Sequence, residues 1–198
     1  MGLPRSAAGT IVAGVVLTVL IGIANGALDA ATCLFFFHVL AGFFWIGLVY
    51  YFAFVHRPAL AAATADPRGA AAIGIVKHVA PRALAWLRWA AVATWLSGAA
   101  ALLRYGLLDD AFMLGLNAGA PLEARVIGIG AWLGTIMLLN VWLLIWPSQK
   151  KLLGLVEASA AEIGRATRIV DYASRVNAVL SVPLLATMVG FGHASFVA

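Results

Sequence analysis

The sequence predicts an all-α integral membrane protein, a polytopic bundle of about five transmembrane helices in one domain that covers residues 1–198. Hydrophobic residues make up 64% of the chain and charged residues only 11%, and the mean hydropathy is +1.00. Soluble domains carry about 25% charged residues, so this chain has too few polar side chains to cover a water-exposed surface. The lipid bilayer is therefore the expected surrounding of the protein.

Five apolar stretches are long enough to cross about 30 Å of hydrocarbon. They lie at residues 10–27, 34–55, 83–103, 126–146 and 176–197. The first stretch follows Arg5 and ends near small residues, as a cleaved signal peptide does. Its length favours a retained helix instead.

The distribution of basic residues predicts the orientation of the chain. With the N-terminus inside and the C-terminus outside, 11 of the 13 Lys and Arg residues fall on the cytoplasmic side. The two exceptions are Arg104 and Arg125. The net charge of +5 is thus explained by topology, and nucleic acid is not expected as a partner. The cytoplasmic residues are Arg5, Arg57, Arg68, Lys77, Arg82, Arg88, Lys150, Lys151, Arg165, Arg168 and Arg175.

The four histidines sort into two pairs by depth. His38 and His56 are 18 residues apart, which is five full turns of an uninterrupted α-helix, and so they are expected on one face about 27 Å apart. His193, near the outer end of the fifth stretch, comes to the depth of His38. His78, just before the third stretch, comes to the depth of His56. The sequence thus predicts an outer pair and an inner pair.

Two imidazoles that face each other across a helix bundle can hold heme iron. We expect the outer pair, His38 and His193, to be the metal ligands of one heme b, and the inner pair to be a second candidate for another. The competing interpretation is that all four are hydrated residues near the membrane interface. A CxxCH motif is absent from the sequence, because its one cysteine is Cys33.

Four further residues are candidates for the cofactor site. Gly42 and Trp45 follow His38 by four and seven residues and so share its helix face, where the glycine would leave a flat hollow for a planar cofactor. Arg104 and Arg125, on the outer side, could pair with heme propionates.

Polar residues near the inner side are expected to form hydrogen bonds or ion pairs with other residues of the protein. Asn140 lies inside the fourth stretch, and an interhelical hydrogen bond is the simplest use of its amide. Asp171, Arg175 and Asn177, at the inner entrance of the fifth stretch, are expected to form a capping or ion-pair cluster.

Four stretches in order resemble the membrane domain of bacterial membrane-bound urate oxidase, also called urate hydroxylase. They are HVLAGFFWIGLVYYFAFV (38–55), PRALAWLRWAAVATWLSG (81–98), LGTIMLLNVWLLIWPSQKK (133–151) and SRVNAVLSVPLLATMVGFGH (174–193). The matching motif positions include His38, Trp45, Asn140, Trp146, Arg175, Asn177 and His193. The resemblance implies a multi-pass oxidoreductase of the bacterial inner (cytoplasmic) membrane that acts on a small reduced substrate such as urate.

That family carries a cytochrome c domain after its membrane part, and this sequence has no CxxCH. We therefore expect electrons to leave through a separate cytochrome c or a quinone. Two other interpretations stay open. The pattern of His38 followed by Trp-x-Gly-x-x-Tyr is also similar to bacterial membrane protoporphyrinogen oxidase. The chain could instead be a non-catalytic accessory subunit, and either kind of protein could be an oligomer. Whether the chain is itself an enzyme is left open, because no acid–base dyad or nucleophile is evident.

Overall fold

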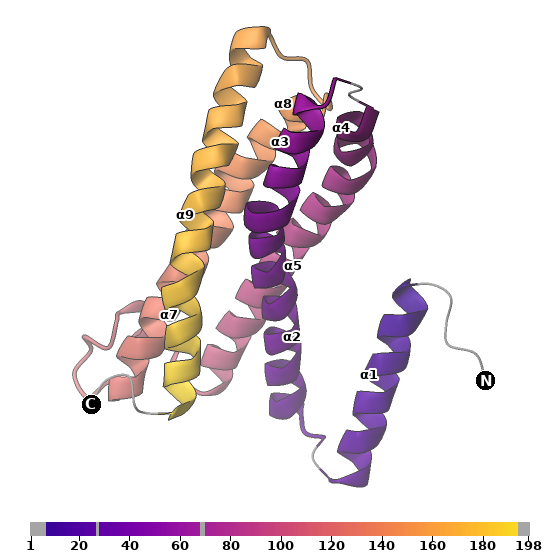
Figure 1. Cartoon of the computed structure of the whole chain (residues 1–198). Helices are drawn as coiled ribbons and strands as arrows, with labels where there is room; N and C mark the ends of the chain where they lie inside the picture. Colours follow the sequence, from indigo (N-terminus) through magenta and orange to yellow (C-terminus); the bar gives the residue numbers. More distant parts are fainter. Residues whose placement is uncertain (1–6, 27, 68–69, 194–198) are drawn as a thin grey trace.

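The computed structural model describes residues 7–26, 28–67 and 70–193, and all regular structure in these ranges is helical (Figure 1). The predicted helical bundle is confirmed. Arg5, Arg68 and the end of the fifth predicted stretch lie outside the described residues. The elements are α1 (Ala7–Ala24), α2 (Ala30–Tyr50), η1 (Tyr51–His56), α3 (Arg57–Ala65), α4 (Ala70–Gly74), η2 (Ile75–Val79), α5 (Ala80–Arg104), α6 (Leu108–Phe112), α7 (Leu122–Leu139), η3 (Asn140–Ile145), α8 (Trp146–Leu152) and α9 (Ala160–His193).

Four long helices form the bundle, and α1 stands apart from them (Figure 1). Elements α2, η1 and α3 form one helix, α4, η2 and α5 the second, and α7, η3 and α8 the third, while α9 is the fourth. Helix α2 packs along α5, and α7 packs along α9; α5 also meets α7, and α2 also meets α9. The core between them contains Trp45, Leu84, Ala91, Met137 and Leu184.

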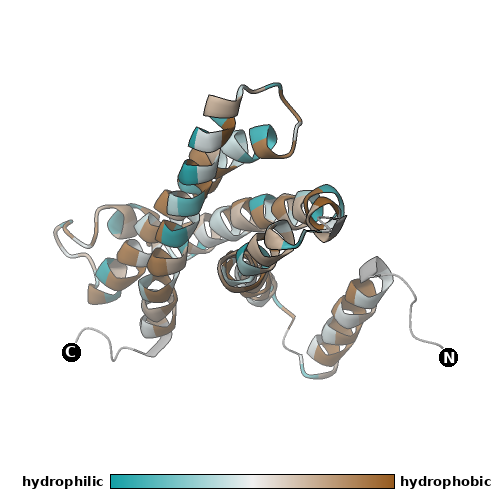
Figure 2. Cartoon of the chain, turned by 45° about the horizontal axis from the view of Figure 1, so that its top comes forward, coloured by the Kyte–Doolittle hydropathy of each residue, from teal (hydrophilic) through white to brown (hydrophobic). Residues whose placement is uncertain are grey.

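Three helices of the described chain are long and apolar enough to cross a membrane: Ala30–Ala65, Leu122–Leu152 and Ala160–Phe191. The apolar part of the first helix, Gly9–Ala24, is shorter. Helix α5 contains three arginines, which lower its hydropathy. Hydrophobic residues run along the helices, and hydrophilic residues gather on the N-terminal half of α9 (Figure 2). This pattern fits a membrane protein, while the number of five spans and the orientation stay predictions.

The three π-helical segments, η1, η2 and η3, have a common local cause. Each is followed, after one residue, by a proline: Pro58, Pro81 and Pro147. A proline ring clashes with the carbonyl four residues earlier, and a wider turn relieves that clash without breaking the helix. The widened turns are visible in hydrogen bonds that span five residues, from Arg57 N to Phe52 O, Ala80 N to Ile75 O and Trp146 N to Val141 O.

The segment η1 overturns one expectation. His38 and His56 were expected on one face because 18 residues make five turns of a regular α-helix. The π-helical turn between Tyr51 and His56 takes up more residues than an α-helical turn. The 18 residues from His38 to His56 therefore no longer make a whole number of turns. The same-face expectation is wrong for this reason.

Side-chain hydrogen bonds cross each of the four helix contacts. His38 Nδ1 bonds to Thr94 O between α2 and α5 at 2.9 Å, and Trp95 Nε1 donates to Thr135 Oγ1 between α5 and α7 at 2.8 Å. Asn140 Nδ2 donates to Asn177 Oδ1 at 2.6 Å, which joins η3 to α9. The hydroxyl groups of Ser181 and Tyr50 bond at 3.0 Å, which joins α9 back to α2. These bonds close a ring around the bundle.

The predicted interhelical bond of Asn140 is therefore confirmed. Its amide also donates to Ala173 O at 2.9 Å, and Asn177 Nδ2 returns a bond to Met137 O at 3.3 Å. The expected ion-pair cluster is present in part: Asp171 pairs with Arg175 at 3.0 Å and also with Arg57. Asn177 does not join that cluster but is buried against Asn140.

We expect Asn177→Ala to lower the free energy of unfolding by about 1–2 kcal/mol, because it leaves buried polar groups of Asn140 and Met137 with fewer partners. Thermal unfolding in detergent measures the loss. The double variant Asn140→Ala/Asn177→Ala should lose less than the sum of the two single variants. Strict additivity would show that the two amides do not stabilise one another.

Candidate functional site

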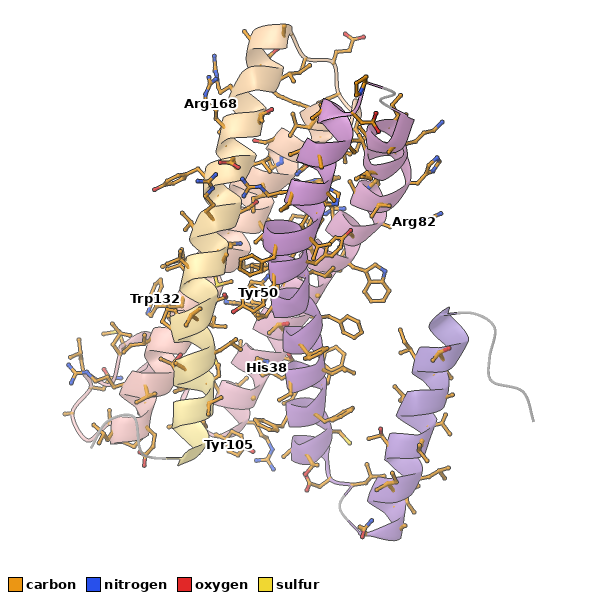
Figure 3. The ribbon with its side chains drawn as sticks, in the orientation of Figure 1. His38, Tyr50, Arg82, Tyr105, Trp132 and Arg168 are labelled. Carbon is orange, nitrogen blue, oxygen red and sulfur yellow. The ribbon has the colours of Figure 1, made fainter. Side chains whose placement is uncertain are left out.

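The imidazole of His38 is fixed against α5. His38 is half-buried on α2, and its Nδ1 lies 2.9 Å from Thr94 O and 3.2 Å from Ser97 Oγ (Figure 3). A carbonyl oxygen can only accept, so the Nδ1 atom must carry the hydrogen. The Ser97 hydroxyl donates its own hydrogen to Ala93 O at 2.6 Å, so its oxygen can accept a hydrogen bond from His38 Nδ1.

This contact determines the tautomer of the ring. With the proton on Nδ1, a neutral His38 has its lone pair on Nε2. No hydrogen bond to Nε2 is formed by any residue in the described ranges. A histidine held to a backbone carbonyl through one nitrogen, with the other left free, has the usual arrangement of a metal-ligating imidazole. The chemistry of this side chain therefore fits an axial ligand of heme iron.

Two glycines of the α2 and α5 contact differ in the space beside them. A methyl group at Gly98 would lie 2.8 Å from His38 Cε1, so the absence of a side chain there makes room for the imidazole. At Gly42, a Cβ would lie 3.5 Å from the γ-methyl of Thr94, which is an ordinary contact, so there is room for one methyl group beside Thr94. The use of this hollow by a cofactor stays a prediction. Trp45, one turn further, is only 2% exposed, and its indole N–H has no acceptor among the described residues.

His193 ends helix α9, and its side chain lies outside the described residues. The depth of its backbone follows from the bond between Ser181 and Tyr50. His38 precedes Tyr50 by 12 residues and His193 follows Ser181 by 12, in helices that run in opposite directions (Figure 1). At 1.5 Å per residue, both lie about 18 Å from that bond toward the same end of the bundle.

Arg104 and Arg125 lie at this end as well. Arg104 is the last residue of α5 and Arg125 belongs to the first turn of α7, and both are exposed. Asp29 caps the start of α2 by accepting from the backbone N–H groups of Ala31 and Thr32. Hydrogen bonds from Thr32, with a smaller contribution from the charge of Arg104, hold the pKa of Asp29 below its usual range.

The inner histidines are placed differently from each other. His56 is 7% exposed in η1, its ring packs edge-on against Phe52 at 4.9 Å, and its Nδ1 has no partner in the described chain. His78 is exposed in η2. Within the described residues, no three His, Cys, Asp or Glu side chains gather as a metal site.

A cluster of aromatic residues around Arg88 was not expected from the sequence as a site. The Cζ atom of Arg88 lies 3.4 Å from the ring centre of Trp146 and 5.6 Å from that of Trp142. Trp89 packs edge-on against Trp142 at 5.6 Å. The signal available in the sequence was an arginine inside the third apolar stretch, since an ionised residue within a span rarely lacks a role.

A shallow groove opens between α9 and the helix formed by η3 and α8. Its lining includes Leu144, Arg165, Arg168, Ile169 and Tyr172. A second hollow beside it is lined in part by Lys151 and Glu162, which form an ion pair at 2.8 Å. Both hollows lie at the end of the bundle opposite His38.

We expect Gly98→Ala to lower the free energy of unfolding by about 1–3 kcal/mol, because the new methyl group collides with the His38 ring. Thermal unfolding in detergent measures this. Gly42→Ala is the matched control, since its methyl group would meet Thr94 at an ordinary contact distance and should be tolerated. Equal stability of the two variants would contradict the close packing of His38 on Gly98.

Comparison with known families finds a match in the C-terminal part of the chain. Residues 121–198, less than half of the chain, match the family described as "Urate oxidase N-terminal". No curated protein and no solved structure matches the chain significantly. The matched region contains α7, η3, α8 and α9, and therefore Asn140, Asn177 and His193. The C-terminal two helices of the bundle are thus similar to a urate oxidase-related family.

Proposed function

We propose that this protein is a b-type heme redox protein of the bacterial inner membrane, related to the membrane part of urate oxidase. The observation that carries the proposal is the imidazole of His38, whose Nδ1 bonds to Thr94 O and whose Nε2 is left free to ligate. His193 is the proposed second ligand, because its backbone comes to the same depth on α9. One heme is the expected content.

Each residue near the proposed site has a defined task. Thr94 and Ser97 orient the His38 ring and fix its tautomer, as outer partners of a metal ligand do. Gly98 provides space for the ring. Arg104 and Arg125 supply positive charge at the end where anionic propionates would reach water. A bound heme would supply one-electron transfer.

The matched family favours urate, or a similar small reduced compound, as the electron donor. The electrons would pass to a cytochrome c or to a quinone. Heme content and substrate are independent parts of this proposal, and each has its own test.

A non-catalytic accessory subunit is the second candidate. It is favoured by the close contact between α2 and α5, where the His38 ring packs on Gly98 and bonds to Thr94 O. In that case the bond from His38 to Thr94 would serve only to hold the two helices together.

The first test is heme content. The protein purified in mild detergent from heme-replete cells should show a b-type absorption spectrum and about one heme per chain by the pyridine hemochrome assay. His38→Ala and His193→Ala should both lose the heme, because each removes one axial ligand. His78→Ala is the matched control and should keep it, since His78 is exposed in η2.

A colourless, well-folded preparation would reject the redox proposal and favour the accessory subunit. Loss of heme in His78→Ala, with retention in His38→Ala, would move the ligand site to the inner pair.

The second test concerns the substrate. If urate is the donor, its ultraviolet absorbance should bleach in the presence of the heme-loaded protein while added cytochrome c or a quinone is reduced. His38→Ala should abolish both signals together. A heme-loaded protein that leaves urate unchanged would keep the redox proposal and reject this substrate.

A further inference from the structure

The guanidinium of Arg88 is held by aromatic rings and not by a carboxylate. It lies 3.4 Å from the ring centre of Trp146, a close cation–π contact, and a second indole, Trp142, lies at 5.6 Å. Such rings orient the cation but satisfy none of its five N–H donors. The one hydrogen bond that it makes to the described residues is from Nε to Leu84 O, at 3.4 Å.

A second cation shares the same ring. The Nζ atom of Lys150 lies 6.0 Å from the ring centre of Trp146. In the part of the chain that the structure describes, no carboxylate oxygen lies within 4.0 Å of the charged nitrogens of Arg88 or Lys150. The indole N–H of Trp142, beside Arg88, is likewise buried without an acceptor. Two cations without a carboxylate partner and an unpaired donor therefore lie around Trp146.

The surroundings of this site are exposed on the outside of the bundle. Trp86 and Trp89, which flank Arg88 on α5, are 55% and 60% exposed. Lys150 and Lys151 lie in the last turn of α8, at the end of the bundle where most of the cations predicted to be cytoplasmic lie. Basic pockets between helices on this side of a membrane bind anionic lipid headgroups.

We propose that Arg88 and Lys150, arranged around Trp146, bind the phosphate of an anionic phospholipid in the inner leaflet. The phosphate would accept from the free guanidinium N–H groups and from the Lys150 ammonium. Trp146 would keep the guanidinium in place, and the acyl chains would lie along the exposed tryptophans of α5. Arg88 lies about 9 Å along α5 from Thr94, the partner of His38, on the side away from Arg104, and so this site is separate from the proposed heme site.

The test measures the thermal unfolding midpoint, Tm, of the full chain in detergent with added phosphatidylglycerol or phosphatidylcholine. Phosphatidylglycerol should raise the Tm and phosphatidylcholine should not. Arg88→Gln and Lys150→Gln should each need about fivefold more phosphatidylglycerol for half of the shift, since one basic residue contributes about 1 kcal/mol at an anionic surface. Arg82→Gln is the matched control, because Arg82 is an exposed cation of the same helix outside the ring cluster (Figure 3).

Three outcomes would overturn the proposal. One is an equal lipid requirement in the wild type and both variants, and another is a loss in Arg82→Gln as large as in Lys150→Gln. The third is an equal rise in Tm with inorganic phosphate alone, which would identify a site for free anions. If Arg88→Gln does not fold, the comparison of Lys150→Gln with the wild type tests the proposal. Native mass spectrometry then counts the phosphatidylglycerol molecules that each of these two proteins retains.

Discussion

Polar side chains inside a lipid-embedded helix have to find their partners within the protein, because hydrocarbon offers none. In this bundle that constraint selects which helices meet. The imidazole of His38 finds the Thr94 carbonyl, the indole of Trp95 finds Thr135, and the amides of Asn140 and Asn177 find each other. With the bond between Ser181 and Tyr50, each helix contact contains at least one such pair. Apolar contacts alone would discriminate poorly among helix faces, because lipid tails are as apolar as the side chains they compete with.

The need to keep backbone groups paired also explains why three of the helices contain a π-helical turn. Pro58, Pro81 and Pro147 would each clash with a carbonyl in a regular α-helix, and the wider turn keeps the helix continuous. The turn also shifts the faces that follow it. His56 is thereby buried against its own aromatic neighbours instead of lining up below His38. Distant residues on one of these helices cannot be assigned to a common face by counting in steps of 3.6.

The two ends of the bundle carry different chemistry. At the end with His38, one imidazole is oriented by a backbone carbonyl and has a free nitrogen, while Arg104 and Arg125 supply isolated positive charge. At the opposite end, cations are abundant and some are neutralised, as Arg57 and Arg175 are by Asp171. Arg88 and Lys150 differ from these because indole rings, and no carboxylates, surround them. Ligation is thus proposed at one end, and recognition of an anionic headgroup at the other.

Composition and hydropathy by themselves determined the helical bundle, because a chain with so few charged residues has to place long apolar helices in lipid. The sequence also determined that Asn140 needs an interhelical partner, since an amide in a span cannot remain unpaired. Only the tertiary structure decided which partner that is, and that Gly98 accommodates the His38 ring. It also decided that Arg88 lies between tryptophans of another helix. These outcomes depend on the register between helices. Contacts between side chains from distant parts of the chain determine that register, and the local periodicity of the sequence does not contain this information.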